Sequence, residues 1–336
     1  MEARRGPDED ITAVSSVAYG FMGSQALFAA LEIGLFTEIA AGPASLDDLA
    51  GRLGSRPRVL LALLEACVAT ELLTREGGRY RNSAAADRYL VRHARGYVGD
   101  YYLRQIATTL YPQVPQARAV VRGESGSETY AGFLDDPARV EEFIRGQHAG
   151  SSGPAYLLAK TQDLAGYRCL LDLGGGSGAF SIEIVRRHGL SAIVVDHPAV
   201  VAAARTIVDE AGLGTRIRCV PGDVVTGAWP GGADLMLLSY VVSSYDRATL
   251  RDLLGRAHAY LPSGGGLIIH DFALHGDQPG PRNAALWYFT NLAISATTHP
   301  HTVPDITRAL TDAGFVDVTA RPHVPGITFA FTVRRA

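Results

Sequence analysis

The sequence of 336 residues has almost no lysine: Lys160 is the only one, and arginine supplies the other strongly basic side chains. The net charge of −3 lacks the strong basic bias that is typical of a nucleic-acid-binding chain. Cysteine is also scarce, and Cys67, Cys169 and Cys219 lie far apart in apolar surroundings. We therefore expect three buried thiols in a reducing cytoplasm and no nucleic-acid partner.

Long apolar runs are missing as well. No apolar run reaches the roughly 20 residues that are needed to cross a bilayer. The first residues, 1–8, lack the apolar core of a signal peptide. These absences predict a cytoplasmic protein without a membrane partner, and the length is sufficient for two domains.

The first part of the chain is rich in helical patterns. Apolar residues recur at helical spacing over 11–40, which predicts burial in a core or a subunit interface. Ser45 begins a further helix as its N-cap, and another helix is expected over 56–70. Residues 72–81 read as a hairpin with a Gly-Gly turn. Together these elements predict a winged-helix pattern.

The predicted second helix of that pattern contains the apolar run 59–64, with few side chains that can read base edges. We therefore expect the winged-helix part, residues 1–100, to serve a structural role instead of binding DNA.

The most informative segment is a predicted β-turn-α unit. An apolar stretch of strand character, 169–173, meets a glycine cluster and then an amphipathic helix, 180–187. Four positions define the spacing D-x-G-x-G-x-G: Asp172, Gly174, Gly176 and Gly178. Dinucleotide folds carry G-x-G-x-x-G instead, and an acid before the glycines would repel a pyrophosphate but suits an ammonium group. The spacing therefore favours S-adenosylmethionine (SAM) over NAD.

Strands and helices alternate after this unit. Strand patterns are found at 193–196, 217–220, 234–240, 266–270, 316–320 and 328–333, the last two as an antiparallel pair. The alternation predicts an α/β fold with a doubly wound parallel sheet, whose ligands bind at the carboxyl ends of the strands. We expect 101–166 to be a helical connector and substrate cover within a second domain, 101–336.

Three acids end three successive strands of this predicted sheet. Asp172 could face the methionine ammonium, Asp196 could accept both ribose hydroxyls, and Asp223 could accept from the adenine amine. Glycine at two positions would let the backbone approach the cofactor without a Cβ clash. The predicted cofactor-binding residues are Asp172, Gly174, Gly176, Asp196, Asp223 and Ser239.

The combination of motifs resembles the SAM-dependent O-methyltransferases of small molecules, which include plant caffeate and isoflavone enzymes and bacterial phenazine and polyketide tailoring enzymes. The glycine motif at 172–178, the family's D-L-P-x-V at 196–200 and Pro221-Gly222-Asp223 carry this resemblance, with the apolar N-terminal helices. It implies a class I methyltransferase Rossmann-like domain, a winged-helix-like dimerisation domain, a homodimer through that domain, SAM as cofactor and a small-molecule substrate.

The sequence departs from the family where the chemistry is expected. Family members usually follow the fourth strand with L-S-x-x-L-H-D-W, whose histidine takes the proton from the acceptor. Here Ser243 stands at the position of the histidine and Ser244 at that of the following acid. A serine of ordinary acidity cannot act as a general base near pH 7. Of the two acids that orient the family histidine, one maps to Asp271, and the other maps near Pro300, where no acid is found.

Three interpretations of this departure stay open. In the first, the enzyme is an O-methyltransferase with a relocated base or an acceptor that is already ionised. In the second, it methylates the carbon of a 2-oxo acid, with a metal assisting enolisation. The metal ligands would then be His270, Asp271, His299 and His301. In the third, the fold runs a different reaction and keeps SAM as a cofactor. A dimeric ligand-binding regulator is a further hypothesis, which the acidic balance disfavours.

Two histidines are the candidates for a relocated base, His148 first and His270 second, and Asp271 joins them in the predicted catalytic set. Aromatic and small residues near the expected pocket suggest an apolar, aromatic or polyketide-like acceptor. The predicted substrate-binding residues are Tyr240, Ser243, Tyr245, Trp287 and Asn291.

Overall fold

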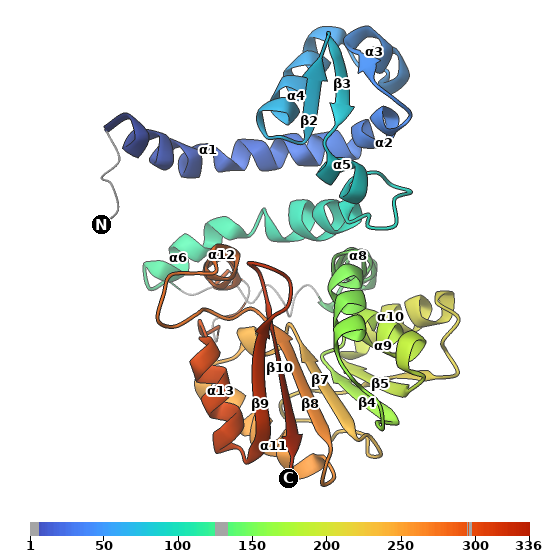
Figure 1. The fold of residues 1–336 in the computed structure, drawn as a ribbon, viewed down its shortest axis with the longest axis vertical. Coiled ribbons are helices and arrows are strands. Elements are labelled where there is room, and N and C mark those ends of the chain that lie inside the picture. The colour runs from blue at the N-terminus through green and yellow to red at the C-terminus, as the bar shows by residue number, and fades with distance from the viewer. Residues whose placement is uncertain (1–6, 125–133, 294, 296–297) are drawn as a thin grey trace. The chain divides into compact units, whose positions relative to one another are not determined.

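The chain divides into two compact units, Met1–Leu103 and Arg104–Ala336, close to the boundary predicted at residue 100. The computed structural model describes residues 7–124, 134–293, 295 and 298–336 (Figure 1). The predicted connector therefore includes positions, 125–133, that lie outside the described residues.

The first unit combines helices with a small sheet. Its elements are α1 (Pro7–Glu32), α2 (Leu35–Ala40), β1 (Ala44–Ser45), α3 (Leu46–Leu53), α4 (Pro57–Ala69), β2 (Leu73–Glu76), β3 (Arg79–Asn82) and α5 (Ala84–Tyr89). The predicted hairpin is confirmed as β2 and β3, joined at Gly77 and Gly78 with positive φ angles. β1 adds a third strand in the order β1-β3-β2. This unit has its own core, which includes Leu35, Phe36 and Leu64.

The predicted cap at Ser45 is confirmed as a capping box. The Ser45 hydroxyl accepts from the Asp48 amide at 3.2 Å, and the Asp48 carboxylate accepts from the Ser45 amide at 3.1 Å. The long helix predicted over 11–40 is broken at Gly34, whose φ of 73° is readily available only to glycine. α3 therefore starts as predicted, and the longer segment becomes two helices.

The apolar face of α1 is exposed in the single chain. Val14 is 64% exposed, Val17 77% and Phe21 51%. Burial of these side chains in the core of their own unit is therefore wrong, and the alternative prediction, a subunit interface, is the one that stays open. Exposed apolar surface of this kind is typical of a protein-protein contact.

In the described part of the chain, no single helix has the length and apolar character that crossing a bilayer requires. Two segments, Ile11–Ala18 and Gly20–Glu32, reach that composition only together, across a 42° bend.

The second unit is an α/β domain, which Figure 1 shows from green to red. A π-helix, η1 (Tyr101–Leu110), leads into it. Its helices are η2 (Val114–Gln116), α6 (Ala117–Val121), α8 (Pro137–Thr161), α9 (Ala179–His188), α10 (Pro198–Glu210), η3 (Val242–Ser244), α11 (Arg247–Tyr260), α12 (Arg282–Asn291) and α13 (Val303–Asp312). Its strands are β4 (Cys169–Leu173), β5 (Ser191–Asp196), β6 (Ile217–Pro221), β7 (Leu235–Ser239), β8 (Gly266–Asp271), β9 (Phe315–Pro322) and β10 (Phe329–Arg335).

Seven strands form the sheet of this unit, in the order β6-β5-β4-β7-β8-β10-β9. The strands from β6 to β8 run parallel, and β10 pairs antiparallel with both β8 and β9. The order reverses direction next to β4, which places a topological switch point at the carboxyl ends of β4 and β7. The predicted doubly wound sheet with a terminal antiparallel pair is confirmed.

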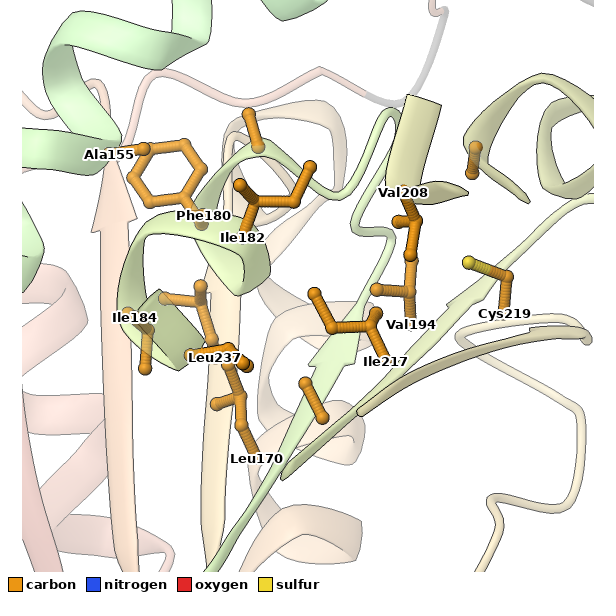
Figure 2. Close-up of a cluster of buried hydrophobic side chains, with 14 of the residues drawn as sticks. Ala155, Leu170, Phe180, Ile182, Ile184, Val194, Val208, Ile217, Cys219 and Leu237 are labelled. Atoms are coloured by element: carbon orange, nitrogen blue, oxygen red, sulfur yellow. The ribbon is translucent and has the colours of Figure 1, made fainter. Parts of the chain in front are cut away.

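Helices cover both faces of the sheet, and the strands are apolar because both faces are buried. Figure 2 shows the core on one face, where Leu170, Val194 and Leu237 from the strands meet Phe180 and Ile184 from α9. A second core lies on the other face and includes Leu238, Leu254 and Phe331. The two cores fix the strand ends where the predicted site residues lie.

Candidate active site

The turn between β4 and α9 brings the predicted glycines against buried groups. Gly174, Gly176 and Gly178 have φ of 68°, 54° and 75°, a region that other residues rarely adopt. A Cβ on Gly175 would lie 2.8 Å from both Asp172 Cγ and Val194 Cγ1. The turn therefore needs glycine for its conformation at three positions and for close packing at a fourth.

Asp172 lies in β4, directly before this turn, and is fully buried. Its Oδ2 accepts a hydrogen bond from the Ser181 hydroxyl at 2.7 Å. Its Oδ1 has no hydrogen-bond partner among the described residues. Burial raises the pKa of this carboxyl to about 7, partly offset by the Ser181 bond. A buried acid with an unpaired oxygen is stabilised in its charged form by a cation placed beside it.

Asp196, at the carboxyl end of β5, is hydrogen-bonded to the glycine turn. Its carboxylate accepts from the Gly176 amide at 2.8 Å and from the His197 amide at 2.7 Å. Burial raises the pKa of Asp196, and these two amide bonds lower it. Asp196 therefore contacts the glycine motif directly. The contact of Asp196 with a ribose stays a prediction.

Asp223, just after β6, caps its own loop. Its Oδ1 accepts from the amides of Val225 and Thr226 at 2.8 and 2.5 Å. The Thr226 bond is the main reason why the pKa of Asp223 lies below its ordinary value. Asp223 is exposed, and its Oδ2 is the oxygen that these two bonds do not use. An adenine amine that bonds to Oδ2 would therefore lie at the surface of the domain.

A small pocket opens beside the glycine turn. Its walls come from β4, α9, the end of β7 and the helix α8: Gln147, Ser151, Asp172, Gly174, Gly175, Ser177, Ala179, Phe180, Ser239 and Tyr240. α8 thus covers the pocket with polar side chains, and an ion pair between Arg145 and Glu210 joins this helix to α10.

The pocket fits the amino-acid end of SAM. An ammonium group would pair with the unpartnered Asp172 oxygen. The glycines let the side chains of Val241 and Gln147 pack directly against the backbone of the turn. The hydroxyls of Ser151 and Ser239 supply hydrogen-bonding groups on the same walls.

Tyr240 is the most strained residue of the site. It follows β7 with a φ of 58°, which is rare for a bulky side chain, and its amide donates to the carbonyl of His270 at 2.8 Å. Strain of this kind clusters at functional sites. The ring packs 4.7 Å from that of His270 and 5.3 Å from that of Phe272, centroid to centroid.

His148 and His270, the predicted bases, are hydrogen-bonded to hydroxyl groups. His148 Nδ1 lies 3.1 Å from the Ser177 oxygen, over the glycine turn. His270 is fully buried, with Nδ1 3.0 Å from the Ser239 oxygen and Nε2 2.9 Å from that of Thr328. Burial lowers the pKa of both imidazoles, that of His270 strongly. Both rings are therefore neutral at pH 7.

Asp271 serves the backbone at the expected base position. It accepts from the amides of Ser243 at 3.1 Å and of Phe272 at 2.8 Å. Burial raises its pKa to about 6 in spite of these bonds. The carboxylate therefore fixes the turn η3, which contains Ser243 and Ser244.

The predicted substrate residues surround the same turn. Asn291 Nδ2 donates to the Ser243 carbonyl at 3.4 Å and to the Thr298 hydroxyl at 2.7 Å. Trp287 stacks on Phe272 at 4.7 Å, inside a cluster that includes Tyr240 and Tyr288. Trp287 and Asn291 both lie on α12.

The candidate metal ligands of the second interpretation are not gathered into one site among the residues that the structure describes. Among them, no three His, Cys, Asp or Glu side chains lie close enough together to hold an ion. The reason is local, because His270 is bound to two hydroxyls and Asp271 to backbone amides. His301 is bound to the Tyr245 carbonyl, and His299 packs beside it at 5.0 Å.

Several residues of the site were not predicted. Gln147 and Ser151 reach the pocket from α8, and Ser177 lies between the glycines and His148. Gln147 and Ser151 stand at positions i and i+4, so helical spacing places them on one face of the helix. Nothing in the sequence indicates which element packs against that face.

Two family models match this chain. A dimerisation domain of O-methyltransferases matches residues 15–92, and an O-methyltransferase domain matches residues 105–316. The second match covers more than half of the sequence, including every predicted site residue.

Relatives of known activity match over nearly the full length. A 3-hydroxy-5-methyl-1-naphthoate 3-O-methyltransferase of Streptomyces sahachiroi is 36% identical, covering 94% of this chain and 92% of the relative. A tetracenomycin polyketide synthesis 8-O-methyl transferase of Streptomyces glaucescens is 32% identical, covering 94% and 93%. The crystal structure of human N-acetylserotonin methyltransferase in complex with SAM superposes with a TM-score of 0.82 at 24% identity, over 100% of both chains.

Proposed function

Because this chain belongs to the O-methyltransferase family, whose members use SAM, we propose that it methylates a hydroxyl oxygen of an aromatic or polyketide-like small molecule. The chain is a SAM-dependent methyltransferase, and its relatives support neither carbon methylation of a 2-oxo acid, nor a non-methylating reaction, nor a regulator without catalysis. The observation that carries the proposal is the unpaired, buried oxygen of Asp172 in the pocket beside the glycine turn.

Residues in and near this pocket each bind a different part of the cofactor. Asp172 binds the ammonium, and Ser239 contributes a hydroxyl from the end of β7. Gly174 and Gly176 present bare backbone, and Asp196 accepts from the ribose while it holds the Gly176 amide. Asp223 accepts from the adenine amine at the outer end of the site.

When bound, SAM supplies a methyl group on a sulfonium sulfur, from which a nucleophilic oxygen can displace it. The protein's part is to align that oxygen and to keep water away. Positioning of this kind is worth several kcal/mol of barrier, about 7–11 in favourable cases. The buried walls around Phe180, Tyr240 and His270 provide the rigid, apolar surroundings that such alignment requires.

We infer an aromatic acceptor from an aromatic cluster in which Tyr240 and Trp287 are half-buried, while Phe272 and Tyr288 are buried. Tyr240, Phe272, Trp287 and Tyr288 form one cluster at the carboxyl edge of the sheet, together with the aliphatic Leu274. Flat apolar rings bind well on such a surface, and the few polar groups beside it set their orientation. Ser243, Tyr245 and Asn291 are the remaining polar residues of the predicted substrate set.

His148, His270 and Asp271 stay predictions as catalytic groups. Their hydrogen bonds favour positioning roles: His148 toward Ser177, His270 toward Ser239, and Asp271 toward the backbone of Ser243.

The assembly that we propose is a homodimer formed through the dimerisation domain. The exposed apolar side chains of α1 that fall within this domain, Val17 and Phe21 among them, are the part that a second copy would cover. The cytoplasmic location expected from the sequence also stays a prediction.

The proposal is tested in two steps with the purified protein. Calorimetric titration with S-adenosylhomocysteine (SAH) is expected to give one site per chain. Incubation with SAM and a panel of hydroxynaphthalenes and hydroxynaphthoates is then expected to yield methyl ethers, identified by mass spectrometry. Binding of SAH with methylation of an amine panel alone would overturn the oxygen acceptor, and the absence of SAH binding would overturn the site.

A further inference from the structure

The imidazole of His301 is buried with one nitrogen paired and the other unpaired. His301 precedes α13 and has no exposed surface. Its Nε2 lies 2.9 Å from the carbonyl oxygen of Tyr245. A carbonyl oxygen only accepts, so Nε2 must carry the proton. In the neutral ring Nδ1 therefore holds a lone pair, and it has no partner among the described residues.

An unpaired buried nitrogen calls for an explanation. Leaving a buried polar atom without a partner costs about 1–3 kcal/mol, and such groups are rare in native proteins. Burial also lowers the pKa of His301, which keeps the ring neutral near pH 7. A neutral imidazole whose Nε2–H donates to a carbonyl and whose Nδ1 is unpaired has the arrangement of a general base.

His301 is held beside the turn from which the family base is missing. Tyr245 directly follows the turn η3, with Ser243 at its centre. Leu274 donates its amide to the His301 carbonyl at 2.9 Å, which ties the histidine to the segment after β8. The ring is therefore fixed in position before any ligand binds.

We propose that His301 is the general base of this enzyme, acting from a neighbouring segment in place of a histidine at position 243. The proposal rests on the proposed O-methylation. As the acceptor O–H bond breaks, its proton moves to His301 Nδ1. The acceptor oxygen forms its bond to the methyl carbon, and the carbon–sulfur bond breaks with its electron pair left on sulfur.

The charges around His301 bear on the imidazolium that forms. The carboxylate of Asp305 favours it, while Arg247 and His299 oppose it. Arg247 is itself paired with Asp305, at 3.1 Å. The Tyr245 carbonyl favours the charged ring as well, because it accepts the Nε2 proton.

A second unpaired group points to the same class of ligand. The indole N–H of Trp287, on α12, is buried and has no partner among the described residues. His301 lacks a donor and Trp287 lacks an acceptor. A hydroxyaromatic acceptor with a further oxygen on its ring system offers both.

The other buried histidines lack this arrangement. Both nitrogens of His270 are bound to hydroxyls, and His148 Nδ1 is bound to Ser177. His323 also donates its Nε2 proton to a carbonyl, that of Pro154 at 3.0 Å, but its Nδ1 is not among the buried unpaired atoms of the described residues.

The test uses His301→Gln, because glutamine keeps a donor for the Tyr245 carbonyl but has no basic nitrogen. His299→Gln is the matched control, since His299 lies on the same segment with its ring 5.0 Å away. With SAM and a weakly acidic naphthol, we expect His301→Gln to lower kcat by about 100-fold or more. The loss should shrink for nitrophenols that are ionised at the assay pH. SAH affinity should equal that of the unchanged protein, and His299→Gln should stay within a few-fold in both assays.

A measurement without turnover separates this proposal from the proposed function. NMR of the SAH complex with isotope-labelled histidine, assigned with His301→Gln, should show His301 protonated at Nε2 only. Adding 2-naphthol should shift the Nδ1 resonance. A proton on Nδ1, no shift with naphthol, or full activity of His301→Gln would overturn the role of His301. Methylation of no acceptor would count against the proposed function, and the Nδ1 result would then decide on His301 alone.

Discussion

Replacing Asp172 with asparagine is expected to stabilise the unliganded protein and to weaken its binding of SAH. Burial raises the pKa of Asp172 from 3.8 to about 7. Between these two values the folded state holds a proton that the unfolded state has released, so stability falls as the pH rises through this window. The displacement corresponds to about 4 kcal/mol at most. An asparagine carries no charge, so the variant does not lose folding stability as the pH rises through this window.

The geometry lets asparagine take the place of the acid. Ser181 donates to Asp172 Oδ2 at 2.7 Å, and the amide oxygen of asparagine can accept the same bond. We expect the free energy of unfolding of Asp172→Asn, relative to the unchanged protein, to grow by about 2–3 kcal/mol between pH 5 and pH 8. Denaturant melts at both pH values measure it, with the exposed Asp252→Asn on α11 as the control.

Binding should respond in the opposite sense. The ammonium of SAH needs the ionised carboxyl, so affinity should fall about tenfold from pH 8 to pH 6 as Asp172 takes up a proton. Asp172→Asn should bind more weakly at pH 8 and lose most of this pH dependence. A variant that is less stable than the unchanged protein at pH 8, or that binds SAH equally well there, would refute the reasoning from Asp172.

Three further predictions concern the site and the assembly. Asp196→Ala should weaken SAH binding by about 1–3 kcal/mol, because the Gly176 amide loses its partner together with the ribose; an unchanged affinity in calorimetry would remove Asp196 from the site. Gly175→Ala should lower SAH affinity, since its Cβ would lie 2.8 Å from Asp172 Cγ, whereas Gly255→Ala on α11 has open space and should bind normally. Val17→Glu on α1, now 77% exposed, should convert the homodimer to monomer in analytical ultracentrifugation, and an unchanged mass would exclude this face.

The sequence was most informative where local rules decide the structure. The acid at 172 and the glycines after it could be placed because a β-turn-α unit has a fixed order of strand, tight turn and helix. The capping box at Ser45 is likewise a contact between residues three apart. Strand alternation predicted the sheet, because helices on both faces leave the strands uniformly apolar.

Contacts between distant segments could not be predicted in the same way. Gln147 reaches the glycine turn only because α8 packs against α9, and neither helix shows this in its own pattern. The sequence pattern indicates His301 only as a candidate metal ligand, since its pairing with Tyr245 depends on how the segment before α13 folds back. The break at Gly34 was missed because apolar residues continue on both sides of it.

The anchoring of the turn η3 has a consequence for how such enzymes diverge. The backbone of this turn is held by groups from other segments: Asp271, Asn291, Ser295 and His301. These backbone contacts do not depend on the side chain at position 243, although the Ser243 hydroxyl adds its own hydrogen bond to Asp271. A different side chain at this position would therefore leave most of the anchoring of the turn intact. A histidine introduced by Ser243→His would find Asp271 beside it and the backbone of the turn already anchored.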